Sequence, residues 1–587
     1  MLGNFDQKKE RGNNMRKSIT NKAVSLVLAC SMVLGTAAGI SGCGSKKKEV
    51  ITLDVFSQLA NYSGLQTGWM GDILKKKFNV KLNIIPDQQG MLQTRMEQGN
   101  LGDIVIWGND DTNYATAVKN GLLFDLEEDN LLKEYGPDIY KNMKPALEKN
   151  RKLTEKITNG KEKKVYGLGD AVALTNDDHQ MFFYNWDVRW DLYKQLGYPQ
   201  VKTLEDFRKL LNDMREICPK DDSDNPTYAV SLWPDWDESM VMYVKATATA
   251  WYGYDELGIG LYDPQTGVYH DAMEEDGPYL EMLKFFNKLN QDGLLDPDSM
   301  TQTYDKMVEK VQNGGVLWSI FNYSGSLAYN KPAHTKAGKM MFCMKPEDAS
   351  PLVYGMNTQG GNHPTCIGAN TEYPELCMEI MNWFCTPEGR MTYGYGPQGV
   401  TWDYDKEKNT YFTDLGKECK KNEKTKMGNG YKGSYHDGVC QAAFSTWAND
   451  AENPDSNGET YNSDNWKSNI TKAETEIEQD WRDKNGVVSI NDYFEKGKYV
   501  VAPGTSFSLG EKDDDLKTTW AQVTSEIKAS SWKAMYAKND KDFDEQVKKM
   551  RANTKKYGYD KCLKWAKEQA AERYALEQEA AKNKEKK

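Results

Sequence analysis

The first constraint on the fold is an alternation of strand-like and helix-like stretches near the start of the chain. Residues 51–56, 80–85 and 104–106 form apolar or alternating runs typical of strands, and two amphipathic stretches separate them. Strand, helix, strand, helix, strand predicts a parallel α/β sheet. Ligands of such open sheets bind beyond the carboxyl ends of the strands. The side chains that follow these ends and line a predicted cleft are Gln58, Asn61, Trp107 and Asp110.

Helix signals recur further along the chain. Thr203 is a predicted N-cap with Asp206 three residues later, and the apolar residues that follow recur at helical spacing. A second helix is predicted from Pro278 to a stop at Gly293, and a third in the stretch that follows Glu372. Residues 511–587 are highly charged with helical character but without a sustained heptad pattern. We therefore expect a helical C-terminal region that lies on the second of two lobes, the one that begins at residue 169.

The N-terminal segment has the composition of an export signal. Arg16, Lys17 and Lys22 precede an almost wholly apolar run at residues 23–34, which is too short to span a membrane. Ile40-Ser41-Gly42-Cys43 resembles the lipobox of bacterial lipoproteins, in which the cysteine is acylated and becomes the new N-terminus. The sequence therefore predicts a lipoprotein signal peptide at residues 1–42, a lipid anchor on Cys43 and a tether at residues 43–50.

Length and charge limit the architecture and the partners. Removing residues 1–42 takes away six Lys/Arg and two Asp/Glu, which changes the formal charge from −12 to −16. An acidic surface repels polyanions and argues against nucleic acid as a partner. The remaining chain is too long for one hydrophobic core, so at least two lobes are expected. No second apolar run approaches membrane length, so we expect membrane attachment through the lipid alone.

Cysteine and histidine usage predicts no metal site. Eight cysteines follow Cys43, scattered without a C-x-x-C pair, and the five histidines never approach H-E-x-x-H spacing. The pattern does not decide which cysteines, if any, form disulfides.

Aromatic residues are abundant, with 16 Trp and 33 Tyr. Flat rings with a polar tip suit surfaces that hold sugars, which have apolar faces and hydroxylated edges. In SLWPDWDESM, Trp233 and Trp236 flank Pro234, so a turn could present both rings beside Asp235 and Asp237. Carboxylates there would accept strong hydrogen bonds from hydroxyl groups. The alternative, a core corner with two buried tryptophans, stays open.

Three short patterns in the sequence imitate cofactor-binding, ion-binding or catalytic motifs. Residues 394–399 match G-x-G-x-x-G but follow a helix and contain Pro397, so the dinucleotide-binding interpretation fails. Residues 481–492 imitate a calcium loop, yet Trp481 occupies its first position and cannot bind a hard cation. The acidic trio Asp235, Asp237 and Glu238 would suit a glycosidase, but the sequence cannot show the spacing that such an enzyme needs.

The chain is expected to visit its two lobes alternately. Residues 51–168 are assigned to lobe 1, residues 169–317 to lobe 2, and residues 318–372 to a return into lobe 1. Residues 373–587 are assigned to a second part of lobe 2, with an insertion at about residues 403–500 whose role the sequence does not reveal. Several crossings of this kind form a hinge, and closure about a hinge is how a cleft engulfs its ligand.

Several stretches together resemble a known family. They are the lipobox at Cys43, GDIVIWG, VRWDLYKQLGYPQVKTLEDF, SLWPDWDES, GLLDPDSMTQ, CTPEGRMTYGYGPQG and YGYDKCLKWAKEQAAERY. They are similar to the family 1 extracellular solute-binding lipoproteins of carbohydrate ABC transporters, in the long form found in Gram-positive bacteria. The resemblance implies an α/β fold with two lobes, of the periplasmic-binding-protein type. It also implies a receptor without catalysis or cofactor that delivers a carbohydrate, often an oligosaccharide, to a permease.

On this basis we expect a monomeric receptor on the outer face of the cytoplasmic membrane. Its predicted ligand-binding residues are Gln58, Asn61, Trp107, Asp110, Arg189, Trp233, Asp235, Trp236, Trp251, Asn322 and Tyr323. Arg189 would meet a sugar carboxylate, or else its neighbourhood only packs the second lobe; both interpretations stay open. The alternatives are a lipid-anchored polysaccharide hydrolase, a receptor for peptides or other solutes, and a surface adhesin that binds glycans without a transporter.

Overall fold

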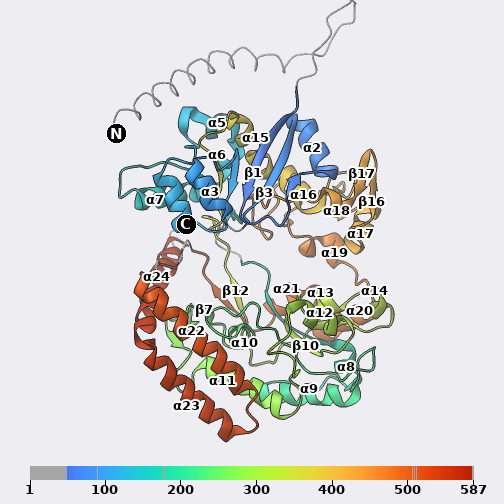
Figure 1. The fold of residues 1–587 in the computed structure, drawn as a ribbon. Helices are drawn as coiled ribbons and strands as arrows, with labels where there is room; N and C mark the ends of the chain where they lie inside the picture. The colour runs from blue at the N-terminus through green and yellow to red at the C-terminus, as the bar shows by residue number, and fades with distance from the viewer. Residues whose placement is uncertain are drawn as a thin grey trace, which may run out of the picture. The chain divides into compact units, whose positions relative to one another are not determined.

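The computed structural model describes residues 49–584 apart from residues 89, 176–178, 506, 508 and 511. The predicted signal peptide, the Cys43 anchor and most of the tether therefore lie outside the described residues. The described chain builds two large hydrophobic cores, one around a mixed sheet and one around a short antiparallel sheet (Figure 1). We call them the first core and the second core.

The first core is organised by a six-stranded sheet in the order β2-β3-β1-β4-β13-β5. β1 (Ile51–Ser57) pairs in parallel with β3 (Val80–Pro86) and with β4 (Ile104–Ile106), as the sequence predicts. β2 (Gly64–Leu65), β13 (Thr365–Ile367) and β5 (Gly167–Leu168) add to it in antiparallel pairs. The helices of residues 68–157 are α2 (Gly68–Phe78), α3 (Met91–Gln98), α4 (Thr112–Lys119), η2 (Glu128–Asn130), α5 (Leu131–Tyr135), α6 (Pro137–Asn142) and α7 (Lys144–Ile157).

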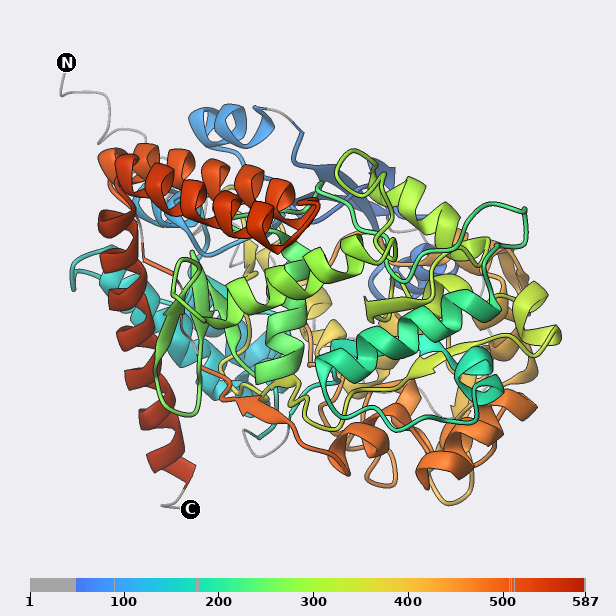
Figure 2. The same ribbon diagram turned by 90° about the horizontal axis from the view of Figure 1, so that it is seen from below.

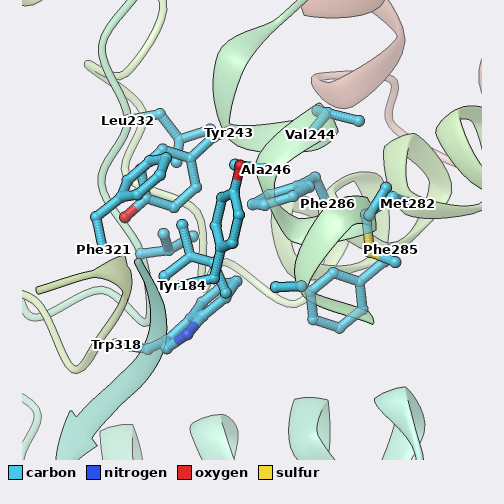
Figure 3. Close-up of a cluster of buried hydrophobic side chains, with 14 of the residues drawn as sticks. Tyr184, Leu232, Tyr243, Val244, Ala246, Met282, Phe285, Phe286, Trp318 and Phe321 are labelled. Carbon is cyan, nitrogen blue, oxygen red and sulfur yellow. The ribbon is translucent and has the colours of Figure 1, made fainter. Parts of the chain in front are cut away.

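The second core surrounds a three-stranded sheet in which β6 (Tyr184–Arg189) lies between β10 (Trp318–Phe321) and β11 (Met341–Cys343). Figure 3 shows how its rings meet: Tyr243 comes from α10 (Met242–Tyr252), Phe286 from α11 (Pro278–Gln291), and Trp318 and Phe321 from β10. The Phe286 and Trp318 rings stack with centroids 6.1 Å apart. Further elements in this part of the chain are α8 (Trp190–Gln195), α9 (Leu204–Ile217), β7 (Asp255–Leu257), β8 (Gly260–Tyr262), β9 (Tyr269–Asp271), α12 (Tyr304–Gln312), α13 (Ser326–Tyr329) and α14 (Pro332–Lys336).

The sequence predicted the individual helices well. α9 begins with a reciprocal capping box between Thr203 and Asp206, and its buried face carries the predicted apolar residues. α11 has Pro278 in its first turn. The C-terminal region is helical, as predicted, and consists of α22 (Asp514–Met535), α23 (Asp540–Lys556) and α24 (Tyr559–Lys584). α22 and α23 pack against each other (Figure 2), and residues of all three helices enter the second core.

The predicted route of the chain between the lobes needs two corrections. Residues 318–321 do not return to the first sheet, because β10 pairs with β6 of the second sheet; only β13 returns. Residues 374–466 do not continue the second lobe, since their buried side chains belong to the first core. This stretch contains α15 (Pro374–Phe384), α16 (Pro387–Tyr395), β14 (Trp402–Tyr404), β15 (Thr410–Phe412), α17 (Asp414–Lys421), β16 (Lys426–Gly428), β17 (Tyr431–Ser434), α18 (Tyr435–Gly438) and η3 (Ser463–Asn465).

Among the described residues, three stretches of chain cross between the two cores. They are residues 169–183, residues 355–364 and residues 467–476, the last of which contains α19 (Lys467–Ile470). The first two run beside each other, because the Gly361 N–H donates to the Asp170 carbonyl and the Ala173 N–H to the Asn357 carbonyl. Beyond the third crossing, α20 (Glu476–Asn485) and α21 (Ile490–Glu495) join the second core, and β18 (Val500–Ala502) pairs with β12 (Leu352–Tyr354).

Candidate ligand-binding site

Polar side chains collect at one edge of the first sheet, where the parallel strands end. The Gln58 side chain, directly after β1, donates to the Asp87 carboxylate at 2.9 Å and accepts from the Gly108 N–H at 3.0 Å. Asp87 follows β3 and Gly108 follows β4, so Gln58 links the ends of all three parallel strands. This is the place at which an open α/β sheet binds ligands. We call it the polar edge.

Two antiparallel strands bring further groups to the polar edge. β13 begins at this edge, because the Trp107 N–H after β4 donates to the Pro364 carbonyl just before β13. β5 ends there, which places Asp170 beside His363, with the imidazole Nδ1 3.1 Å from the Asp170 carboxylate. The hydrogen bond with Asp170 raises the pKa of His363. Burial pushes the pKa of Asp170 up, but the bonds with His363 outweigh it and hold that pKa below its usual value.

Asp110 and Lys149 complete the polar edge. Burial raises the pKa of the half-buried Asp110, and nearby Lys149 opposes that rise. Burial lowers the pKa of Lys149, whose ammonium group donates to the carbonyl of Gly361 at 2.6 Å and to that of Gly360 at 3.3 Å. Two of the three N–H donors of Lys149 are therefore bonded to backbone carbonyls of the second crossing stretch, residues 355–364.

The second core contributes an aromatic surface. Trp233 is 1% exposed and lies beneath the rings of Trp236 and Tyr304, at centroid distances of 5.4 and 5.1 Å. The Trp236 and Tyr304 rings lie 4.5 Å apart, and Tyr323 is 6.0 Å from Trp236. Phe183 extends the group, 6.0 Å from Tyr323. We call these five residues the aromatic cluster.

Part of the aromatic cluster is open to solvent. Trp236 is 45% exposed and Phe183 is 44% exposed, whereas most tryptophans among the described residues are buried. Asp235 lies beside the cluster, where its carboxylate accepts from the Tyr304 N–H at 3.0 Å. The exposed Trp236 ring rests on the buried Trp233, and the Phe183 ring packs on Phe321 and Tyr323. These rings form an apolar platform, and the adjacent Asp235 carboxylate can accept hydrogen bonds at its rim.

The structure brings many of the predicted site residues into these two surfaces. Gln58 and Asp110 lie at the polar edge, and Trp233, Asp235, Trp236 and Tyr323 lie in or beside the aromatic cluster. Asn322 is half-buried next to Tyr323, and Asn61 is exposed in the loop after β1.

Three predicted residues do not present their side chains at either surface. Trp107 is 0% exposed, and its ring packs edge-on against Tyr114 in the interior. Arg189 is 3% exposed and forms a bidentate pair with Asp191 at 2.9 and 2.7 Å, so its guanidinium is not available to a sugar carboxylate. Trp251 is half-buried and packs on Trp186 of the second core. As placed here, these are packing residues.

Sequence reasoning missed several members of the two surfaces. Tyr304 and Phe183 belong to the aromatic cluster, and Lys149, Asp170 and His363 belong to the polar edge. Tyr304 follows Thr303, which caps α12, so a helix start next to an aromatic residue was a usable signal. His363 and Asp170 are 193 positions apart, and no local pattern connects them.

Other features of the described residues do not coincide with the predicted site. A polar pocket of ≈ 500 Å³ lies between residues 409–470 and residues 489–495, but none of the predicted site residues lines it. Within residues 49–584 as described, no three His, Cys, Asp or Glu side chains are grouped to hold a metal ion. The eight cysteines of that range are free. None of the described helices is both long and apolar enough to cross a membrane.

Comparison with known families identifies the class of protein. The family described as Bacterial extracellular solute-binding protein matches residues 69–401, which is more than half of the chain. The chain therefore belongs to this family of extracellular solute-binding proteins, as the sequence motifs indicated.

Individual relatives are distant. The chain is 24% identical over 321 residues to Lipoprotein LipO of Bacillus subtilis (strain 168). That alignment covers 51% of this chain and 56% of LipO, so the chain spans about half the length of this curated relative.

Solved structures with the same fold match almost from end to end. A solute-binding protein of Bifidobacterium longum infantis, described as binding HMO, has a TM-score of 0.55 at 13% identity, covering 89% of this chain and 99% of that one. The N-glycan transport protein NgtS of Streptococcus pneumoniae has a TM-score of 0.51 at 18% identity, with 90% and 99% coverage. FusA of S. pneumoniae in complex with kestose has a TM-score of 0.54 at 14% identity, with 89% and 99% coverage. These likenesses confirm the predicted two-lobed α/β fold.

Proposed function

We propose that this protein is a lipid-anchored receptor that captures a carbohydrate, most simply an oligosaccharide, and delivers it to an ABC importer without changing it chemically. The observation that carries the proposal is the aromatic cluster, with Trp236 and Phe183 both exposed on a rigid base. The faces of sugar rings stack on such platforms, while their hydroxyl groups bond to carboxylates and amides at the rim. No catalytic role is required of any residue.

The path of the chain supports a site shared by the two surfaces. β5 ends at the polar edge, and the next strand along the chain is β6, whose first residue Tyr184 pairs with Phe321. The aromatic cluster therefore surrounds the point at which the crossing chain enters the second sheet, and the polar edge surrounds the point at which it leaves the first. We place the ligand between these two points, and we expect the two lobes to close on it by bending at the three crossing stretches.

The fold relatives favour a saccharide over other solutes. NgtS is described as an N-glycan transport protein, and FusA was solved with kestose. Low sequence identity prevents direct transfer of their ligands, so the chemical argument must come from this chain. Its polar edge holds carboxylate, amide and imidazole groups, and its aromatic cluster supplies apolar faces. This combination suits hydroxylated rings better than an extended peptide, which would need a row of unpaired backbone groups.

Anchoring and the importer complete the proposal. Acylation of Cys43 would hold the receptor at the outer face of the cytoplasmic membrane, and residues 43–50 would form a short tether. The name of LipO, a lipoprotein, supports this assignment. A permease would receive the loaded receptor, which we expect to act as a monomer.

The proposal is tested by thermal unfolding of residues 44–587 against a panel of oligosaccharides, with each mixture also assayed for released sugar. A bound ligand raises the melting temperature because its stabilisation grows as RT ln(1 + [L]/Kd). Trp236→Ala and Phe183→Ala should each weaken the binding of the stabilising glycan by about tenfold, which corresponds to the loss of about 1.4 kcal/mol of stacking free energy. Tyr140→Ala on α6 is the matched control, because Tyr140 is 42% exposed and outside both surfaces.

Each outcome has a distinct meaning. A raised melting temperature without product, lost in the two cluster variants and kept in the control, supports the receptor. Release of sugar would instead favour the hydrolase, with Asp235 and Glu238 as candidate catalytic carboxylates. Stabilisation by peptides but by no glycan would refute the carbohydrate assignment and keep the solute-binding fold.

A further inference from the structure

The charges around the proposed site have an uneven distribution. Carboxylates reach both of its surfaces: Asp110 and Asp170 lie half-buried at the polar edge, and Asp235 is exposed beside the aromatic cluster. Asp87 joins them through its bond with Gln58. Sugar hydroxyl groups can donate to such oxygens in charge-assisted bonds.

The cations near these carboxylates are already engaged. The Lys149 ammonium donates to the carbonyls of Gly360 and Gly361, and His363 is paired with Asp170. On the side of the second core, Lys245 is 6% exposed and lies between the carboxylates of Glu238 and Glu256.

Two arginines are also engaged in contacts. Arg189 is held by Asp191 in a bidentate pair, and the guanidinium of Arg95 lies over the Phe56 ring at 5.3 Å. Recognition of a carboxylate normally uses a planar guanidinium that can offer two parallel donors. Asp191 already occupies the two parallel donors of Arg189, and the Arg95 guanidinium packs on the buried Phe56 ring.

An anionic sugar would therefore meet repulsion without compensation. Its carboxylate would lose water on entering the site, would lie near Asp110, Asp170 or Asp235, and would have to break an existing pair to gain a cation. An uncharged sugar of the same shape has no such cost, because its hydroxyl groups both donate and accept.

We propose that the site takes uncharged oligosaccharides and rejects glycans that bear uronic or sialic acid carboxylates. This proposal rests on the proposed carbohydrate-receptor function and specifies the chemical class of its ligand. The sequence left open whether Arg189 meets a sugar carboxylate. It does not, because its guanidinium is bonded to Asp191 within the second core.

The test compares two ligands that differ only in charge. The first is a neutral oligosaccharide found to stabilise residues 44–587, and the second is the same oligosaccharide with one primary alcohol oxidised to a carboxylate. Titration calorimetry at low and at high salt should show the oxidised ligand binding at least tenfold more weakly at low salt, with the difference shrinking as salt screens the repulsion. The methyl ester of the oxidised ligand controls for the added bulk and should bind close to the neutral parent.

Charge-neutralising variants provide the second arm. Asp110→Asn and Asp170→Asn should each reduce the penalty on the oxidised ligand, whereas Asp544→Asn on α23, a carboxylate that is 75% exposed, should leave it unchanged. Equal or tighter binding of the oxidised ligand would overturn the inference and leave the receptor function standing. If neither neutral nor acidic glycans raise the melting temperature, the proposed function fails and this inference fails with it.

Discussion

The C-terminal helix α24 is fastened to the second core by a buried charge group centred on Arg573. Its guanidinium donates to Asp255 of β7 at 2.8 Å and to Glu577 at 2.9 Å. Tyr262 donates to the Glu577 carboxylate at 2.6 Å, and Tyr354 donates to that of Asp255 at 2.8 Å. Burial raises the pKa of Glu577, and Arg573 opposes that rise.

Arg573→Ala should loosen α24 substantially. The Asp255 and Glu577 side chains are 6% and 1% exposed, so the substitution leaves two carboxylates buried without their cation. Breaking a buried pair by removing one partner costs about 3–5 kcal/mol. The variant also loses the contact of the guanidinium with the Tyr262 ring at 4.7 Å. If α24 opens locally, its amide exchange should accelerate by about 10²-fold to 4 × 10³-fold, since about 1.4 kcal/mol is a factor of ten.

Hydrogen exchange followed by mass spectrometry on α24 peptides measures this directly. The matched control is Lys564→Ala on the same helix, because Lys564 is 79% exposed and its ion pair with Glu568 spans 4.0 Å. That variant should change exchange by less than about threefold. A triple variant, Arg573→Met with Asp255→Asn and Glu577→Gln, should recover much of the protection. Exchange in Arg573→Ala within threefold of wild type would refute the reasoning that this charge group holds the helix.

Three further predictions concern other parts of the chain. His363→Gln should destabilise the protein more at about pH 5.5 than at about pH 8.5 in thermal unfolding, because a raised histidine pKa contributes stability below 6.5 that is lost as pH rises through the folded value; a pH-independent loss would contradict the pairing with Asp170. Thr203→Ala removes the cap that bonds Asp206 and should cost about 1 kcal/mol in urea unfolding; no measurable loss would contradict it. Cys43→Ala in the full-length chain should move the protein from the membrane fraction to the medium, and retention on the membrane would refute lipid anchoring through that cysteine.

Local structure was predictable wherever a signal lies within one or two helical turns. The α9 cap needs only Thr203 and Asp206, and the α11 start needs only Pro278. The parallel part of the first sheet was also predictable, because strand, helix and strand follow one another along the chain. Two of the antiparallel additions to that sheet, β13 and β5, come from residues far away in sequence and left no local trace.

The direction of each aromatic side chain was not predictable from composition. Trp233 and Trp236 are three residues apart, yet the first is 1% exposed and the second 45%. The turn at Pro234 therefore presents one ring and buries the other beneath it as support. Trp107 directly follows a buried strand, and its ring turns into the core formed with Tyr114. A ligand-binding role needs an exposed face, which depends on what covers each ring.

The assignment of Trp318–Phe321 to the first lobe failed because a short apolar strand does not encode its partner. The Trp318 ring stacks on Trp186 of β6 with centroids 5.8 Å apart, and this contact joins residues more than 130 positions apart. Its consequence is functional, since the pairing of β10 with β6 carries Phe321, Asn322 and Tyr323 to the start of β6, beside Phe183. Had β10 joined the first sheet, Tyr323 would lie away from Trp236, and the aromatic cluster would not form. The short strand whose lobe was wrongly predicted, β10, is thus the one that positions Tyr323 in the proposed sugar-binding platform.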